Sequence, residues 1–552
     1  MTVSSRGPAA YWTRTYRRFR CQALQRLAAC FAPLALALVL ASCALPDNDS
    51  QQGYTTERAS RLFAVGFQDV ADIYIDDVPI ADLALAGLEN LSAIDPAVSV
   101  TRKSNRVILA IDGNDRAGFA TPGPKDADAW GNLAAELVEI SRQYSGRMAG
   151  APAEDVYEAV FDGLTAELDS FSRYSGRDEA RENRASRDGF GGIGVRIGLV
   201  DEGIKVLSVM ENTPAEEAGI KDEDVIVAID GEAARGLSQR EAVRRLRGPL
   251  RSKVILTLDR AGESATHEIE VVRAHIVPQT VEYRAENDIG YLRVTGFNQS
   301  TAWTLRKKIE LAESQLGERL KGFILDLRGN PGGLLDQSVV VSDIFLQSGR
   351  IVSTHGRHPD SHQYFDADSD DVAGGLPVVV LVNGNSASAS EIVAAALQDS
   401  GRAVVIGSNS FGKGTVQTVL RLPNEGELTL TWARFHAPTG YGLHRRGVLP
   451  DICTSRDVTS VADMEERLRA GTLPIDKGLR RSDIPVGDDK ALAALRASCP
   501  GNEGENGIDI EIANDLLTNP ALYAIALRGA PNTARKPADQ VSAAGQAGSA
   551  AQ

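Results

Sequence analysis

Residues 377–417 alternate between short apolar runs and turns rich in glycine or serine, and this alternation constrains the fold more than any other stretch. The run Val378–Val382 is β-branched and follows a proline, which is typical of a buried parallel strand. A turn at 383–385 leads into a helix expected at Glu391–Leu397, and a second apolar strand is expected at Ala403–Ile406. Strand, helix and strand in this order predict a mostly parallel α/β layer.

The same alternation extends over residues 280–455, which we expect to form one α/β domain. Strands are predicted at Ile289–Val294 and Gly322–Leu327, and helices at Ala302–Leu311 and Leu335–Phe345. A segment of this length is large enough to bury a core of its own.

Three serines alternate with alanines between the first predicted strand and the helix that follows it. The middle one, Ser388, has Glu391 three positions later, and this spacing matches the S-x-x-E capping box. The same position would also hold a hydroxyl at a helix N-terminus, where free N–H groups can stabilise an anion. The segment alone therefore leaves open both a structural cap and a nucleophile.

Two glycine-rich turns lie in the same domain. The first, 328–333, follows a predicted strand and is either an ordinary tight turn or a source of exposed N–H donors. The second, 411–414, places Lys413 between two glycines. A serine nucleophile needs a base, and a lysine can serve only if its pKa falls well below about 10.4. A surface lysine in a turn is the alternative, and the seven histidines remain possible bases because partners meet in space.

Residues 189–275 differ in character from the rest of the chain. A glycine-rich loop is followed by predicted strands at Val195–Val200 and Gly203–Val209 and a helix at Ser238–Leu246. This pattern resembles a PDZ domain of the bacterial, circularly permuted kind. The resemblance implies that loop N–H groups bind a peptide C-terminal carboxylate while the peptide adds as a strand, although the fold could instead only pack internally. The carboxylate-binding loop would comprise Gly192, Ile193, Gly194 and Val195.

Residues 1–42 are interpreted as a signal peptide and excluded from the fold. Arginines precede an apolar run, Leu27–Leu40, that is short for a membrane-spanning helix. The run ends in Leu-Ala-Ser before Cys43, which resembles the bacterial lipobox and implies lipidation of Cys43. We expect a lipoprotein on the periplasmic side of the bacterial cell envelope, with an uncleaved anchor as the alternative. Ala44 favours the outer membrane over the inner one.

Two cysteines, Cys453 and Cys499, follow the signal peptide and the lipidation position. An even pair in an oxidising compartment suggests that they form a disulfide.

Histidines and aspartates gather at 355–371, where a metal ion is conceivable but a solvated loop is the simpler interpretation. No CxxC or His/Cys array indicates zinc, so we expect neither a metal nor a cofactor.

Charge and composition describe the remaining segments. Acidic residues outnumber basic ones by 74 to 59, which argues against nucleic acid or an anionic membrane surface as the main partner.

Residues 43–60 are predicted to be a polar tether and 61–187 a mainly helical domain. The charged run 177–189 is expected to be an exposed linker. Residues 456–529 are predicted to form a C-terminal helical extension, and 530–552 a disordered tail.

Three motifs together resemble those of the carboxyl-terminal processing (tail-specific) proteases. They are SASASE at 386–391, FGKGTVQ at 411–417 and LDLR…PGG at 325–333, with the PDZ-like segment before them. The resemblance covers residues 60–455 and implies a Ser-Lys peptidase that needs no metal. The sequence departs from the family pattern at 168–172, where LDSFS replaces LDPHS, and at His436, where a tyrosine is common.

The resemblance also implies roles for individual residues. The nucleophile falls on Ser388 and the general base on Lys413, with the oxyanion bound by the backbone N–H groups of Gly333 and Ala389. Gln417 would help to hold the lysine, although a fully extended strand would separate the two by about 13 Å.

The whole sequence predicts a multidomain α/β protein: a mostly parallel protease core, a permuted PDZ domain and an N-terminal helical domain. The expected function is that of a serine endopeptidase that binds protein C-terminal tails through the PDZ domain and cleaves with a Ser-Lys dyad. A non-catalytic PDZ-based scaffold in the cell envelope is the alternative, and a Ser-His-Asp esterase lacks its G-x-S-x-G elbow. Expected partners are substrates with free C-terminal tails. The sequence does not predict their identity, an adaptor or the oligomeric state.

Overall fold

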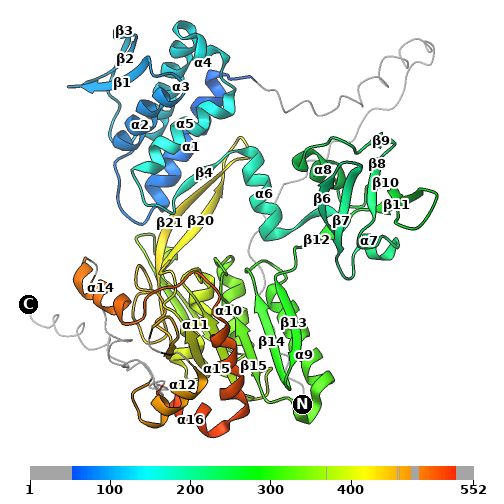
Figure 1. Cartoon of the computed structure of the whole chain (residues 1–552). Coiled ribbons are helices and arrows are strands. Elements are labelled where there is room, and N and C mark those ends of the chain that lie inside the picture. Colours follow the sequence, from blue (N-terminus) through cyan, green and yellow to red (C-terminus); the bar gives the residue numbers. More distant parts are fainter. Residues whose placement is uncertain are drawn as a thin grey trace, which may run out of the picture. The chain divides into compact units, whose positions relative to one another are not determined.

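The computed structural model describes residues 53–368, 370–456, 458, 460–473, 484–485 and 487–529. Apart from Gly53, these residues belong to one compact unit, which begins at Tyr54. It combines N-terminal helices, an antiparallel sheet of the PDZ type and a mostly parallel sheet, which confirms the predicted multidomain α/β class (Figure 1). The predicted signal peptide, Cys43 and the tail from 530 onward lie outside the described residues.

The N-terminal domain packs helices around an aromatic core that includes Phe63, Trp130 and Phe161, and it adds a three-stranded antiparallel sheet. Its first helix begins within the range predicted to be a tether, so that boundary was wrong. Thr55 caps this helix by accepting the N–H of Arg58. The elements are α1 (Thr56–Ile73), α2 (Ile80–Glu89), β1 (Val98–Lys103), β2 (Arg106–Ile111), β3 (Asn114–Ala120), α3 (Ala127–Tyr144), α4 (Gly146–Gly150) and α5 (Ala153–Ala166).

The charged run predicted to be a linker is a helix instead, α6 (Arg177–Asp188), which follows the short strand β4 (Arg173–Ser175). Acidic side chains in its first turn and Arg187 in its last turn complement the helix dipole. Arg187 and Arg184 both lie 2.9 Å from the buried carboxylate of Glu427. Such ion pairs stabilise a helix that hydrophobic periodicity alone does not indicate.

The next domain is a sheet in the order β11-β10-β8-β7-β6 with antiparallel neighbours. Inward-facing aliphatic side chains such as Ile204, Val206 and Ile226 form its core. The two predicted strands at 195–200 and 203–209 are confirmed. Its elements are β5 (Phe190–Gly192), β6 (Val195–Val200), β7 (Gly203–Val209), α7 (Pro214–Glu217), β8 (Val225–Ile229), β9 (Glu232–Ala233), α8 (Gln239–Leu246), β10 (Lys253–Asp259), β11 (His267–Val272) and β12 (Ala274–Ile276).

The core domain is built on a six-stranded sheet in the order β13-β14-β15-β18-β19-β22, parallel except for the antiparallel edge strand β13. Alternate side chains of each strand enter opposite layers. Val380 packs in the core shared with α11, whereas Val379 packs in the core shared with α15 and α16. The elements are β13 (Val281–Glu286), β14 (Ile289–Val294), α9 (Thr301–Leu316), β15 (Phe323–Asp326), α10 (Leu335–Asp343), β18 (Val378–Val382), α11 (Ala389–Asp399), β19 (Ala403–Gly407), β22 (Ile452–Cys453), α12 (Val461–Arg469), α14 (Asp489–Ser498), α15 (Gly507–Thr518) and α16 (Pro520–Gly529).

A second sheet, in the order β17-β16-β21-β20, completes the core domain, and β4 pairs with β21. A bulge between Val416 and Gln417 interrupts the pairing of β20 with β21. The strands are β16 (Gly349–His355), β17 (Gln363–Ala367), β20 (Thr415–Arg421) and β21 (Glu427–His436).

The carboxyl ends of three adjacent parallel strands bring the predicted motifs together. The glycine turn 328–333 follows β15, the serine turn 383–388 follows β18, and the loop containing Lys413 follows β19. In parallel α/β sheets this edge is where sites form.

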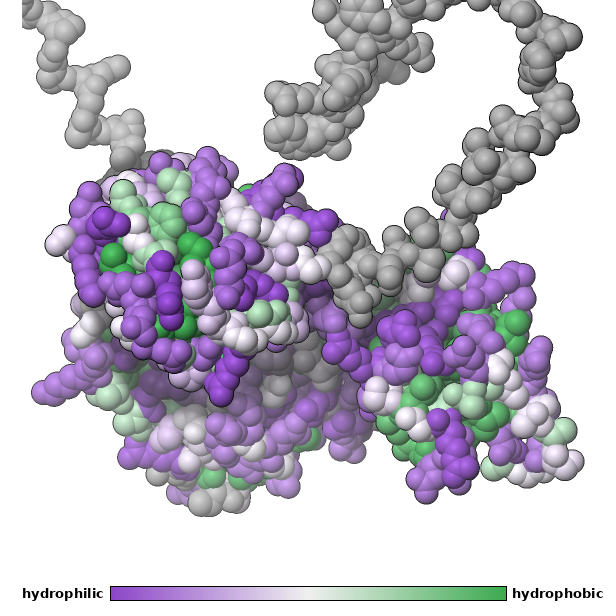
Figure 2. All heavy atoms as spheres, turned by 90° about the horizontal axis from the view of Figure 1, so that it is seen from above, coloured by the Kyte–Doolittle hydropathy of each residue, from purple (hydrophilic) through white to green (hydrophobic). Residues whose placement is uncertain are grey.

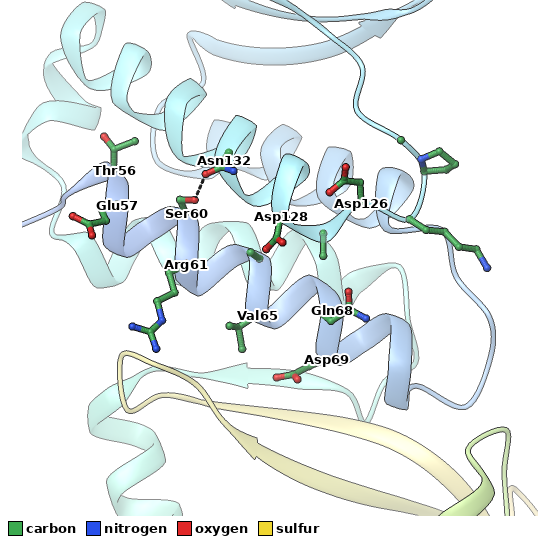
Figure 3. Close-up of a pocket in the computed structure, with 15 residues that line it drawn as sticks. Thr56, Glu57, Ser60, Arg61, Val65, Gln68, Asp69, Asp126, Asp128 and Asn132 are labelled. Carbon is green, nitrogen blue, oxygen red and sulfur yellow. Dashed lines mark hydrogen bonds between the residues drawn. The ribbon is translucent and has the colours of Figure 1, made fainter.

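An open groove of about 1260 Å³ runs along α1 and α3 (Figure 3). In it, Ser60 Oγ donates a hydrogen bond to Asn132 Oδ1 at 2.5 Å. Burial, reinforced by the charge of Asp72, raises the pKa of Asp69 to about 6. All lining residues lie between 56 and 132, so this groove is separate from the predicted catalytic motifs.

Hydrophilic side chains dominate the face drawn in Figure 2, with smaller hydrophobic patches between them. Among the residues that the structure describes, no helix combines the length and apolar character needed to cross a membrane.

Candidate active site

The three serines of the serine turn differ in burial and in their hydrogen bonds. Ser386 and Ser390 are fully buried, and their hydroxyls donate to the carbonyls of Leu327 and Asn330 at 2.8 and 2.9 Å. Ser388 is only half-buried, and its φ of 56° and ψ of −113° are unusual for a non-glycine residue. Strained backbone of this kind is concentrated at functional sites. Ser386 and Ser390 therefore hold the turn, and Ser388 is the serine left to react.

The predicted capping box between Ser388 and Glu391 is present at the start of α11. The Glu391 carboxylate accepts the Ser388 N–H at 2.7 Å. Capping and reactivity thus coexist at this position, because the helix N-terminus that the cap completes also presents the N–H of Ala389.

The glycine turn lies directly against the serine turn. A Cβ added to Gly332 would come within 2.9 Å of Ser388 Cβ and 3.0 Å of Ala389 N, so only glycine allows this approach. In the described part of the chain, neither the N–H of Gly333 nor that of Ala389 makes a hydrogen bond. Two unused N–H donors beside a strained serine are what an oxyanion hole requires.

The loop carrying Lys413 is held by the same carboxylate that holds Ser388. Glu391 Oε1 accepts the N–H of Gly412 at 2.7 Å and the hydroxyl of Ser410 at 2.5 Å. Glu391 Oε2 accepts the N–H of Lys413 at 2.9 Å, and it is also the oxygen bound by Ser388 N–H. One buried carboxylate oxygen therefore fixes the backbones of both predicted catalytic residues.

Burial raises the pKa of Glu391, and the four hydrogen bonds act in the opposite direction. Three of the four partners are N–H groups that can only donate. The fourth, the Ser410 hydroxyl, already accepts the N–H of Val448 at 2.7 Å and donates its own hydrogen to Glu391, so an ionised carboxylate satisfies all four bonds. We therefore take Glu391 to be ionised at neutral pH.

The side-chain nitrogen of Lys413 lies against a segment that is distant from it in the sequence. Its Nζ is 5.0 Å from the centre of the Phe171 ring. Burial, followed by the charge of Arg173, lowers the pKa of Lys413, while Asp169 and Glu391 oppose this shift. Segment 168–173, including the stretch that departs from the family pattern, thus forms the environment of the lysine. Within the described residues no hydrogen bond joins Lys413 Nζ to Ser388 Oγ.

Among the described residues, no hydrogen bond is seen between Gln417 and Lys413, so the predicted role of Gln417 stays a prediction. Its amide donates to Thr415 Oγ1 at 2.9 Å and to Thr431 Oγ1 at 3.2 Å. The bulge before Gln417 alters the strand, but its side chain stays with the threonines of the sheet.

The predicted carboxylate-binding loop lines a small groove of about 80 Å³ between β6 and α8. Gly194 has a φ of 88°, and a Cβ there would approach Thr213 within 2.3 Å, so the loop requires glycine. Arg247 lies at the groove over the Phe190 ring and pairs with Glu182 at 2.7 Å. The groove is otherwise lined by Gly192, Ile193, Gly194, Val195, Ile197, Val243 and Leu246.

Cys453 and Cys499 form a disulfide in the structure.

Among the histidines, His355 and His362 approach each other at 3.2 Å between their Nδ1 atoms. Within the described residues no group of three or more His, Cys, Asp or Glu side chains is arranged to hold a metal ion.

Sequence reasoning missed the part that four residues play in the site. Glu391 was visible only as a capping residue, because its bonds to 410–413 cross a whole strand. Phe171 and Arg173 carry no motif signal that links them to the lysine. Arg496, beyond the resembling region, donates to the carbonyls of 410, 411, 445 and 446.

Comparison with known proteins identifies the family and the domains of the chain. The model of peptidase family S41 matches residues 288–454, and a PDZ model matches residues 205–260. A carboxy-terminal-processing protease of Bartonella bacilliformis is 43% identical over 301 residues, 54% of this chain and 69% of the relative. The carboxy-terminal processing protease CtpA of Bacillus subtilis is 34% identical over 347 residues, 62% and 72% of the two chains.

Among solved structures, the photosystem II D1 C-terminal processing protease aligns with 25% identity and a TM-score of 0.36, covering 71% of this chain and 92% of that one. The two curated relatives are matched over more than two thirds of their length, and both bear the same functional name. The chain therefore belongs to peptidase family S41 and is a carboxy-terminal processing serine protease with a PDZ domain.

Proposed function

We propose that this protease cleaves with a Ser388–Lys413 dyad and binds the oxyanion with the N–H groups of Gly333 and Ala389. The observation that carries the proposal is the shared Glu391 oxygen, which holds the backbones of Ser388 and Lys413 in one place. The half-exposed serine and the lowered pKa of the lysine support the same assignment.

In the first step, neutral Lys413 removes the proton from the Ser388 hydroxyl as the oxygen attacks the scissile carbonyl. For this step the Nζ of Lys413, which lies over the Phe171 ring here, has to come within hydrogen-bond distance of the Ser388 hydroxyl. Catalytic hydrogen bonds are often open without substrate and close when it binds. The developing oxyanion then accepts hydrogen bonds from Gly333 and Ala389, each of which is worth about 2.7–4 kcal/mol in comparable sites.

In the second step, protonated Lys413 gives its proton to the departing amine, and the acyl group remains on Ser388. A water molecule then attacks the ester, with Lys413 as the base, and the free serine is restored. No step requires a metal or an organic cofactor.

The PDZ domain is proposed to hold the C-terminal residues of the substrate while the chain reaches the serine. The apolar lining of the groove, including Val195, Ile197 and Val243, fits an apolar terminal side chain. Its volume of about 80 Å³ suits a small aliphatic residue.

We further propose that the mature chain is attached to lipid at Cys43 and works on the periplasmic side of the outer membrane. The proposal rests on the lipobox-like end of the N-terminal apolar run and on Ala44.

Removing either member of the dyad should abolish proteolysis. We expect Ser388→Ala and Lys413→Ala each to lower cleavage of β-casein by more than about 1000-fold, because neither group acts without the other. Lys321→Ala, which changes an exposed lysine of the core domain, should leave the rate unchanged. Full activity in Ser388→Ala would favour the non-catalytic scaffold over this proposal.

The rate should rise with pH through the pKa of Lys413, because only the neutral amine is a base. That pKa lies below the ordinary 10.5, so the rise should occur below this pH. Arg173→Ala removes a positive charge that lowers this pKa, so the midpoint of the kcat/KM profile should move to higher pH. Arg319→Ala is the control, and an unchanged midpoint in Arg173→Ala would count against Lys413 as the base.

A substitution in the PDZ groove should weaken binding of the substrate tail without changing the reactivity of Ser388. Val243→Asp places a charge in the apolar groove and should weaken binding of a fluorescent peptide with a C-terminal valine by at least about tenfold. The rate at which a fluorophosphonate labels Ser388 should stay the same. Leu207→Asp, on an exposed position of the same domain, is the matched control. Equal binding by the two variants would place the tail site elsewhere.

Lipid attachment can be tested through Cys43. Cys43→Ala should prevent incorporation of labelled palmitate and reduce the share of the protein in the outer-membrane fraction. Cys21→Ala and Cys30→Ala, both within the predicted signal peptide, should change neither quantity. Labelling that persists in Cys43→Ala would contradict the assignment.

A further inference from the structure

The segment 496–509, which we name the C-terminal clamp, lies beyond the part of the chain that matches the S41 family. It begins in the last turn of α14 and ends in the first turn of α15. The clamp touches both loops that carry the proposed catalytic residues.

Arg496 binds the loop that leads to Lys413. Its Nη1 donates to the carbonyls of Arg445 and Arg446 at 3.1 and 3.2 Å, and to that of Phe411 at 3.4 Å. Its Nη2 donates to the carbonyl of Ser410 at 3.4 Å. One guanidinium thus joins the lysine loop to the segment packed against it. The charge of Arg496 also acts on Glu391, the carboxylate that binds both catalytic backbones.

Asn502 binds the serine turn on its other side. Its carbonyl accepts the N–H of Gly384 at 2.7 Å, and its own N–H donates to Ser408 Oγ at 2.9 Å. The next residue, Glu503, accepts the side-chain amide of Asn383 at 3.1 Å. The turn that precedes Ser388 therefore depends on backbone partners from the clamp.

Two connections fasten the clamp to the central sheet. The Cys453–Cys499 disulfide joins it to β22, which pairs with β19. Cys499 is fully buried, and it stands three residues after Arg496 and three before Asn502. At the far end, Asp509 accepts Arg328 at 3.1 Å and Thr454 at 2.5 Å. The disulfide is thus the fixed point between the two residues that touch the catalytic loops.

We propose that the clamp is a positioning element of the active site: Arg496 and Asn502 hold the lysine loop and the serine turn, and the Cys453–Cys499 disulfide holds both of them. This inference rests on the proposed assignment of Ser388 and Lys413. Opening the disulfide should leave the loops formed but less ordered, and a displacement of about 1 Å can lower a rate by roughly 100-fold.

The opening step is a thiol–disulfide exchange. A dithiol such as dithiothreitol supplies two electrons and two protons, its own sulfurs form a disulfide, and Cys453 and Cys499 become two thiols. The exchange acts on the buried core side of the clamp and leaves the PDZ groove untouched.

The experiment compares the oxidised and the dithiothreitol-reduced full-length enzyme. We expect reduction to lower kcat for β-casein by about 10- to 100-fold per folded molecule, and reoxidation to restore it. Binding of the valine-ended peptide should stay constant. Cys453→Ser/Cys499→Ser should show the low kcat and no response to the reductant. An unchanged kcat after reduction, with the two thiols verified by mass spectrometry, would overturn the inference.

Substitutions in the clamp separate positioning from simple stabilisation. Arg496→Ala should lower kcat with little change in KM, whereas Arg496→Lys should recover part of it, because lysine keeps the charge but loses the planar fork. Lys490→Ala, an exposed position on the same helix, is the control. A purely structural role would lower the folded fraction and leave kcat per folded molecule unchanged, and that result would refute the inference.

The catalytic dyad and the positioning role of the clamp are disproved by different results. If Ser388→Ala keeps full activity, the proposed dyad is wrong whatever the clamp does. If Ser388→Ala is inactive but reduction and Arg496→Ala have no effect on kcat, the dyad stands and the clamp is not part of it.

Discussion

The active-site arrangement depends on the buried carboxylate of Glu391. Burying an ionised group without partners costs several kcal/mol, and this cost is offset by four donated hydrogen bonds of about 1.5–3 kcal/mol each. Two of those donors are the backbone N–H groups of Ser388 and Lys413. The same interaction that keeps the charge buried therefore also fixes the separation of the two backbones, because movement of either loop would cost the buried carboxylate at least one of its donors.

Part of the surroundings of Lys413 is made by residues that precede the PDZ domain in the sequence, whereas Lys413 itself follows that domain. Phe171 and Arg173 precede that domain in the chain, and β4 carries Arg173 into pairing with β21 of the core. Helix α6 is then fastened to Glu427 by Arg184 and Arg187. The lysine pKa is thus set by a strand that the chain supplies before the PDZ domain and by a sheet that it supplies afterwards.

Local pattern predicted the fold of the core well, and long-range contacts explain what it missed. The strand Val378–Val382 was predicted to the residue because a β-branched run between a proline and a turn has few alternatives. Helix α6 was missed because its stability comes from ion pairs with Glu427, some 240 positions away. The family motifs pointed to Ser388 and Lys413, but the carboxylate that joins them and the ring beside the lysine follow from tertiary packing alone. The role that the resemblance implies for Gln417 stays a prediction, since its amide donates to two threonines of the sheet here.

The C-terminal clamp shows why the matched family region does not complete the site by itself. Without it, the N–H of Gly384 would lose Asn502 and the partly buried carbonyl of Ser410 would lose Arg496, whereas the carbonyl of Arg446 would keep the side-chain amide of Asn409. A buried polar group left unpaired costs about 1–3 kcal/mol, which is large against the total stability of a domain. Loops facing that cost would rearrange to find other partners, and the serine and lysine turns are the segments that would move. The hydrogen bonds from the C-terminal clamp thus contribute to the stability of the serine and lysine turns. The buried Cys453–Cys499 disulfide attaches the clamp covalently to β22.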